Sequence, residues 1–106
     1  IVITIFSYYR FAFFIYKILA FYDLEPQAPV HVLVIPKEHI CCADAVNEEN
    51  VGNIAHIFTK IPEITKSLGL TNGYRIVNNC GEDGCQSVKH MHFHILGGKK
   101  LNGTMA

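Results

Sequence analysis

The chain has 106 residues, half of them hydrophobic, and its nine basic residues balance nine acidic ones. This length favours one small domain with a core of its own, and the balanced charge argues against nucleic-acid binding, which calls for a basic patch. The four cysteines include the adjacent pair Cys41 and Cys42, a poor disulfide framework, so we expect reduced thiols in a cytoplasmic protein.

Residues 1–22 are rich in Ile, Phe and Tyr, a composition that also occurs in membrane spans. Arg10 and Lys17 interrupt this stretch, and charged residues in the middle of a span are costly. The segment also lacks the basic start and the small-residue cleavage site of a signal peptide. We therefore expect no membrane association and one or two strands here, with Ile18–Tyr22 the best defined.

The middle of the chain alternates between turn signals and apolar runs. Pro26 and Pro29 mark a loop over Asp23–Pro29. The β-branched run that follows predicts a strand over His31–Pro36. A helix is expected over Asn47–Leu68, because its apolar residues recur with helical spacing at Ile54, Ile57, Phe58, Ile61, Ile64 and Leu68.

Two residues should shape this helix. Pro62 lacks an N–H and clashes with the preceding turn, so it should kink the helix or divide it in two. Gly69 suits the end of a helix, where the backbone often takes a left-handed conformation.

The last third of the chain predicts a strand at Tyr74–Asn78, a glycine-containing loop at Asn79–Gln86 and a strand at Ser87–Leu96. Gly97 and Gly98 should end this last strand. Strands thus flank one helical region without repeated β-α-β alternation. That order predicts an α+β domain with an antiparallel sheet.

The strand at Ser87–Leu96 contains the most informative pattern, in which His90, His92 and His94 alternate with Met91 and Phe93. Side chains of a strand point alternately to opposite faces, so the three imidazoles should share one face and the apolar residues should enter the core. Imidazole can act as acid, base, nucleophile or metal ligand. The pattern therefore predicts a reactive site.

Two kinds of chemistry fit these histidines. A neutral imidazole can attack phosphorus and form a covalent intermediate, and its neighbours can fix its tautomer and bind phosphate oxygens. Alternatively, the histidines can bind zinc with His31 or His39 as a further ligand. The preceding loop, Asn78–Ser87, favours phosphorus chemistry, because its amides, hydroxyl and glycines suit phosphate oxygens. Asp23 can accept hydrogen bonds from ribose hydroxyls, although such a residue alone is more often a turn residue.

Two long stretches resemble the histidine triad (HIT) superfamily. Gln86–Gly98 is similar to the family signature, and Asp23–Ile40 is similar to its other strongly patterned region. Gly73-Tyr74-Arg75 also fits, so the resemblance runs from about Leu19 to Gly98. It is closest to the branch of histidine triad nucleotide-binding proteins, also called Hint or protein kinase C inhibitor-like proteins.

This resemblance implies a homodimer whose antiparallel sheet continues across the subunit interface. It also implies binding of a purine nucleoside monophosphate and hydrolysis of nucleoside phosphoramidates, with neither metal nor other cofactor. In this family's chemistry His92 is the nucleophile, His90 orients it, His31 supports the network, and His94 contacts phosphate near the leaving group. The implied nucleotide contacts are Asn79, Gln86 and Ser87 to the phosphate or leaving group, Asp23 to the ribose, and Phe21 and Leu24 to the base.

The chain also departs from the family pattern. Residues 1–17 look foreign to it, and the N-terminal Cys-x-x-Cys of many bacterial zinc-binding relatives is missing, so we expect no structural zinc. Cys85 stands where relatives usually have glycine, and it would be strained if the position needs a positive φ. These departures motivate an alternative, a nucleotide-binding or scaffold protein with weak or no catalysis. A zinc-dependent hydrolase is the third hypothesis.

Overall fold

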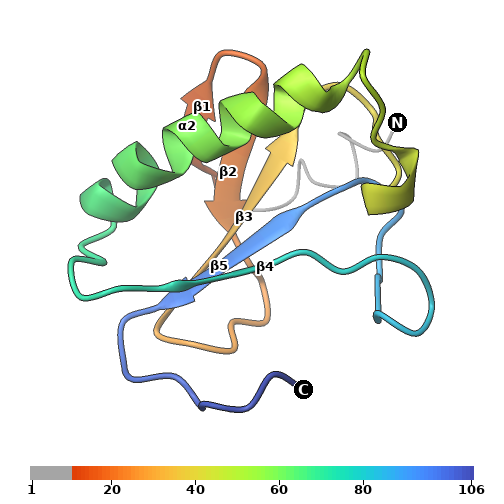
Figure 1. The fold of residues 1–106 in the computed structure, drawn as a ribbon. Helices are drawn as coiled ribbons and strands as arrows, with labels where there is room; N and C mark the ends of the chain where they lie inside the picture. The colour runs from red at the N-terminus through yellow and green to blue at the C-terminus, as the bar shows by residue number, and fades with distance from the viewer. Residues whose placement is uncertain (1–10) are drawn as a thin grey trace.

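One antiparallel sheet of five strands forms the body of the molecule, and one long helix crosses one of its faces (Figure 1). This computed structural model describes residues 11–106. The part of the N-terminal strand prediction that falls on residues 1–10 lies outside the described residues. The α+β class with an antiparallel sheet and one main helix is confirmed. In the described part of the chain, no helix has the length and apolar character to cross a membrane.

The strands lie in the order β1-β2-β3-β5-β4, and each pairs antiparallel with its neighbour. Lys17, with φ 65°, lies in the turn between β1 and β2. The predicted strands before residue 80 are therefore present, with bounds that differ by a few residues. The five are β1 (Phe11–Ile15), β2 (Ile18–Tyr22), β3 (Val30–Pro36), β4 (Arg75–Val77) and β5 (Phe93–Gly97).

The alternation of side chains in β2, β3 and β5 gives the sheet two different faces. One face packs against α2 and forms the main core, which includes Val32, Val34, Phe93 and Ile95. The opposite face carries a smaller buried cluster of Leu19, Phe21, Leu33 and Ile35, against which Val88 packs. His31 and His94 alternate with main-core residues, so they belong to this second face.

Helix α2 spans Val51–Ser67, four residues later at its start than the pattern predicts. The side chain of Asn47 holds residues 47–50 in a turn instead, because its Oδ1 accepts hydrogen bonds from the backbone N–H groups of Glu49 and Asn50. Pro62 lies inside one continuous helix, so a division into two helices is wrong. A short 3-10 helix, η1 (Ala43–Ala45), precedes α2.

Gly69 ends the helix as predicted. Its φ is +77°, and the N–H of Leu70 donates to the carbonyl of Thr65 while that of Gly69 donates to Lys66. This pair of bonds is the Schellman motif, which satisfies the last carbonyls of a helix.

The predicted strand over Ser87–Leu96 is wrong in its first half, because β5 begins only at Phe93. The β3–β5 register pairs Val34 with Phe93, and its continuation would oppose Met91 to Pro36. Proline has no N–H for the ladder, and the N–H of Met91 donates to the carbonyl of Ile40 instead, at 2.7 Å. His90 and His92 thus precede the strand, although Met91, Phe93 and Ile95 do enter the core as predicted.

Candidate active site

The first part of the site is a pair of histidines on neighbouring strands. His31 on β3 and His94 on β5 lie on the sheet face opposite α2, and His31 Nε2 is 2.8 Å from His94 Nδ1. His31 is almost fully buried, at 3% exposure. The sheet register therefore brings together residues that lie far apart in the sequence.

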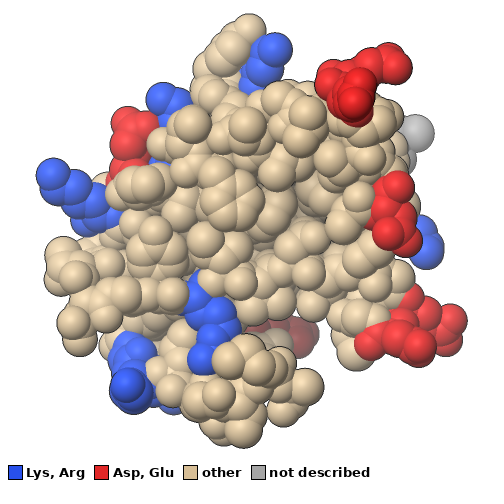
Figure 2. All heavy atoms as spheres, in the orientation of Figure 1, with Lys and Arg blue, Asp and Glu red and all other residues tan. Residues whose placement is uncertain are grey.

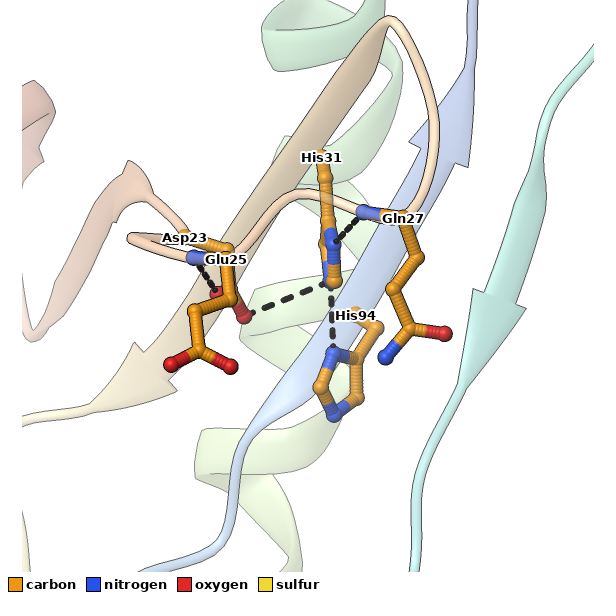
Figure 3. A network of polar contacts seen from close by, with 5 residues as sticks. All are labelled: Asp23, Glu25, Gln27, His31 and His94. Carbon is orange, nitrogen blue, oxygen red and sulfur yellow. Dashed lines mark hydrogen bonds and ion pairs between the residues drawn. The ribbon is translucent and has the colours of Figure 1, made fainter.

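The hydrogen bonds of this pair fix where each proton lies (Figure 3). The backbone N–H of Gln27 donates to His31 Nδ1, so neutral His31 carries its proton on Nε2. That proton is donated to His94 Nδ1, which leaves the proton of neutral His94 on Nε2. His94 is thus a hydrogen-bond donor at Nε2, the property needed to contact a phosphate oxygen.

The surroundings keep both rings neutral. Burial, together with the neighbouring His92 and His31, lowers the pKa of His94 to about 4. Burial also lowers the pKa of His31, and the carboxylate of Asp23 opposes this shift in part. Since both histidines stay neutral near pH 7, the chain of donors and acceptors holds there.

His92 takes its orientation from the backbone rather than from the sheet ladder. Its Nδ1 donates to the carbonyl of His90 at 2.7 Å, and its own carbonyl accepts a hydrogen bond from Asn78 Nδ2 at 2.9 Å. A neutral imidazole protonated on Nδ1 bears its lone pair on Nε2. The ring centroids of His92 and His94 are 5.2 Å apart, so the ring with its lone pair on Nε2 and the ring with its proton on Nε2 are neighbours.

His90 is the most buried of the group, at 1% exposure. Its Nε2 donates to the carbonyl of Pro36 at 2.7 Å, at the end of β3. Its Nδ1 lies 3.3 Å from Nδ1 of His39. Burial lowers the pKa of His90, and the neighbouring His39 and His92 lower it further.

The loop before the histidines is closed by the Gln86 side chain. Its Oε1 accepts from the N–H of Gly81, and its Nε2 donates to the carbonyls of Cys41 and Val88. Both amide hydrogens are therefore used within the protein, and Gln86 acts here as a brace for the loop. Of the other predicted phosphate contacts, Ser87 is exposed and Asn79 is partly buried.

Cys85, in the same loop, has φ 60°. The strain expected from a residue other than glycine at this position is therefore present. Like the other cysteines of the chain, it is a free thiol.

The residues predicted to hold the nucleoside differ in their access. Asp23 lies beside the histidines, with its Oδ2 3.5 Å from His31 Nε2, while its Oδ1 accepts from the N–H of Glu25 (Figure 3). Leu24 is 61% exposed and can meet a base directly. Phe21 is fully buried in the smaller cluster, so a base reaches its ring only if a neighbouring side chain moves.

Asp23, His31 and His94 offer three potential metal-ligating atoms within 4.8 Å of one another. Their hydrogen bonds fit a metal poorly. A metal on His31 Nε2 would displace the proton of neutral His31 to Nδ1, where it would oppose the N–H of Gln27 at 3.0 Å. Two donors would then face each other, so the donor set suits a chain of neutral imidazoles better than a cation.

Three residues that organise the site carry no signal specific enough to assign them a role from the sequence. Gln27 acts through its backbone N–H, which any residue except proline supplies. Asn78 adjoins the predicted phosphate loop but supports His92. The sequence suggests His39 only as an optional metal ligand, and in the structure it contacts His90 instead.

Comparisons with known proteins agree with this geometry. The HIT domain family profile matches residues 10–101. An uncharacterised HIT-like protein of Rickettsia prowazekii is 48% identical over 91 residues, which are 84% of this chain and 76% of that protein. A histidine triad protein from Clostridium difficile shares 41% identity at a TM-score of 0.86, over 91% of this chain and 84% of its own. A HIT family hydrolase from Legionella pneumophila shares 37% identity at a TM-score of 0.88, over 92% of this chain and 88% of the hydrolase.

Proposed function

This chain belongs to the HIT domain family, and from that premise we propose that it hydrolyses nucleoside phosphoramidates through a covalent nucleotidyl-histidine intermediate. The observation that carries the proposal is the tautomer of His92. Its Nδ1 proton is held by the carbonyl of His90, so Nε2 bears the lone pair that attack on phosphorus requires. The hydrolase from Legionella pneumophila supports hydrolysis as the general reaction type.

The reaction has two displacements at the α-phosphorus. In the first, His92 Nε2 forms a bond to phosphorus, the P–N bond of the substrate breaks, and the amine leaves with a proton from solvent. The carbonyl of His90 then stabilises the positive charge of the nucleotidyl-imidazole at Nδ1. In the second, water attacks phosphorus and loses a proton to solvent, the bond to His92 breaks with its electron pair returning to Nε2, and the nucleoside monophosphate is released.

His94 supports both steps as a neutral donor. Its Nε2–H stabilises the negative charge that develops on the phosphate oxygens, and His31 holds its other nitrogen. Ser87 and Asn79 supply further polar contacts from the loop, Asp23 accepts from the ribose hydroxyls, and Leu24 covers a purine base. Gln86 contributes by keeping the loop closed.

Turnover of adenosine 5′-phosphoramidate tests the proposal directly. We expect release of AMP and, after rapid acid-free quenching, a peptide containing His92 with one added nucleotidyl group. Release of AMP without any such adduct in the wild type, and with undiminished rate in His92→Ala, would contradict it.

The second candidate function is nucleotide binding with little or no catalysis, and the left-handed backbone at Cys85 favours it. Strain within the phosphate loop can displace it from the geometry that the transition state needs. Calorimetry with AMP and the turnover assay separate the two functions. Binding without turnover supports the second, and rapid turnover excludes it.

We further propose that the chain forms a homodimer through β4 and α2. β4 is the last strand in the sheet order, and α2 exposes Val51 and Phe58, at 46% and 47%. Figure 2 shows that the middle of the face crossed by α2 bears few charged side chains. Light scattering should give twice the chain mass, and Phe58→Glu should give the single mass.

A further inference from the structure

We propose that His39 is a positioning residue for the nucleophile, which it holds by fixing the tautomer and place of His90. This inference rests on the proposed function, because it assigns the support of the same His92. His39 lies just beyond the end of β3 and outside the alternating histidine pattern, and it is exposed, in contrast to the buried His90 that it contacts.

The argument begins at the buried end of His90. The carbonyl of Pro36 only accepts hydrogen bonds, so His90 Nε2 must carry a proton to donate to it. Neutral His90 then has its lone pair on Nδ1. That nitrogen is an acceptor at an almost fully buried residue, and a buried acceptor needs a donor.

His39 supplies this donor. Its Nδ1 is 3.3 Å from His90 Nδ1, so neutral His39 must carry its proton on Nδ1. The two rings are 5.2 Å apart between centroids. A protonated His39 also donates from Nδ1, so the contact holds in both charge states of His39.

The segment 39–40 thereby holds the segment 90–91 at two points. His39 holds the His90 ring, and the carbonyl of Ile40 accepts the N–H of Met91 at 2.7 Å. Between these points lies the carbonyl of His90, which receives the Nδ1 proton of His92. A change in the protonation of His90 is thus transmitted to the group that orients the nucleophile.

Two variants of His39 test whether this residue acts as a hydrogen-bond donor or only fills space. His39→Asn can place an amide N–H near the position of Nδ1, whereas His39→Asp places a carboxylate there, which only accepts. That carboxylate would draw a proton onto His90 Nδ1 and make the ring a cation. Among the residues that the structure describes, the titratable groups that face His90 in the wild type are His39 and His92. A cationic His90 opposes formation of the positively charged intermediate on His92.

We expect His39→Asn to keep kcat within about threefold of wild type and His39→Asp to lower it by about tenfold or more, with KM little changed. His56→Asp is the matched control. His56 is on α2 and its Nε2 contacts the carbonyl of Tyr16, so this variant should leave kcat unchanged.

Nitrogen-15 NMR of the histidine side chains tests the same inference without any activity. In the wild type, His90 should be protonated on Nε2 alone, and in His39→Asp on both nitrogens; His39→Asn should match the wild type. A wild-type His90 protonated on Nδ1 alone, or equal NMR and kinetic behaviour of the Asn and Asp variants, would overturn the proposal. A wild type that shows the expected tautomer but no turnover would refute the proposed function and leave this assignment of His90 and His39 intact.

Discussion

The two histidine contacts of this protein are built in different ways. The His31–His94 contact lies inside the sheet, where the register of β3 and β5 sets its geometry. The His39–His90 contact lies beyond the last ladder pair, where bonds to backbone carbonyls replace the ladder. In the proposed reaction, the ladder thus positions the N–H donor of His94, and the segment beyond it positions the nucleophile His92.

The largest effect is expected when the proposed nucleophile, His92, is removed from the segment outside the ladder. We expect His92→Ala to lower kcat by about 10³-fold or more, because no other described group presents an equivalent nitrogen lone pair at this place. Steady-state turnover of adenosine 5′-phosphoramidate measures the loss. Activity close to wild type would show that the reaction runs without His92.

The role of His94, which lies within the β3–β5 ladder, is tested by two matched variants. His94→Gln can keep an N–H near the position of Nε2, whereas His94→Asn reaches only as far as Nδ1. We expect a loss in kcat of about 10²-fold for Asn and a clearly smaller one for Gln. If the two variants lose equally, His94 does not act as an Nε2 donor, and the proton assignment of the His31–His94 pair fails.

Acid should lower the stability of the folded protein through His94, the histidine within the β3–β5 ladder. The pKa of His94 is about 4 in the folded protein and 6.5 in its ordinary state, so the unfolded chain binds the proton first as the pH falls. His94 therefore does not destabilise the protein above about pH 6.5, and its contribution should lower the free energy of unfolding by up to roughly 1.4 kcal/mol per pH unit between 6.5 and 4.

Urea unfolding at several pH values measures this slope, and His94→Gln serves as the control. The variant should lose the part of the slope that belongs to His94, while the buried His31 and His90 keep theirs. A slope unchanged in the variant would contradict the assignment.

The smallest expected effect concerns the loop that adjoins the nucleophile. Cys85 and Gly81 both have positive φ, at 60° and 76°. We expect Cys85→Gly to stabilise the protein by up to about 1 kcal/mol through relief of backbone strain, and Gly81→Ala to destabilise it by about as much or more.

Thermal melts of the two variants measure both effects. The site around Gly81 has open space for a Cβ, so a loss in Gly81→Ala reports the backbone alone. A destabilised Cys85→Gly would show that packing of the thiol outweighs the strain. Raised turnover in Cys85→Gly would show in addition that this strain limits catalysis.

Much of the fold follows from local patterns. The β-branched run of β3, the helical spacing in α2 and the glycine at position 69 each specify a structure that depends on near neighbours in the chain. The predicted bounds are wrong where a distant contact or a side-chain contact determines the local structure. Asn47 turns the chain before α2 can begin, and the lack of an N–H at Pro36 coincides with the end of the ladder before His92.

The site divides in the same way. The alternating histidines predict a reactive centre, and the resemblance to the HIT family implies that His92, His90, His94 and His31 belong to it. The partners that fix their protons could not be read from that pattern. They are a backbone N–H at Gln27, a carbonyl at Pro36 and the ring of His39, and each is brought into place by the fold.

The sequence by itself therefore determined the class of fold and the family, and it predicted the residue types of the proposed reaction, because these depend on periodicity and on motifs of consecutive residues. Only the tertiary structure decided which nitrogen of each imidazole carries the proton. A tautomer is set by the donor or acceptor that faces each nitrogen, and those groups come from segments far away in the chain.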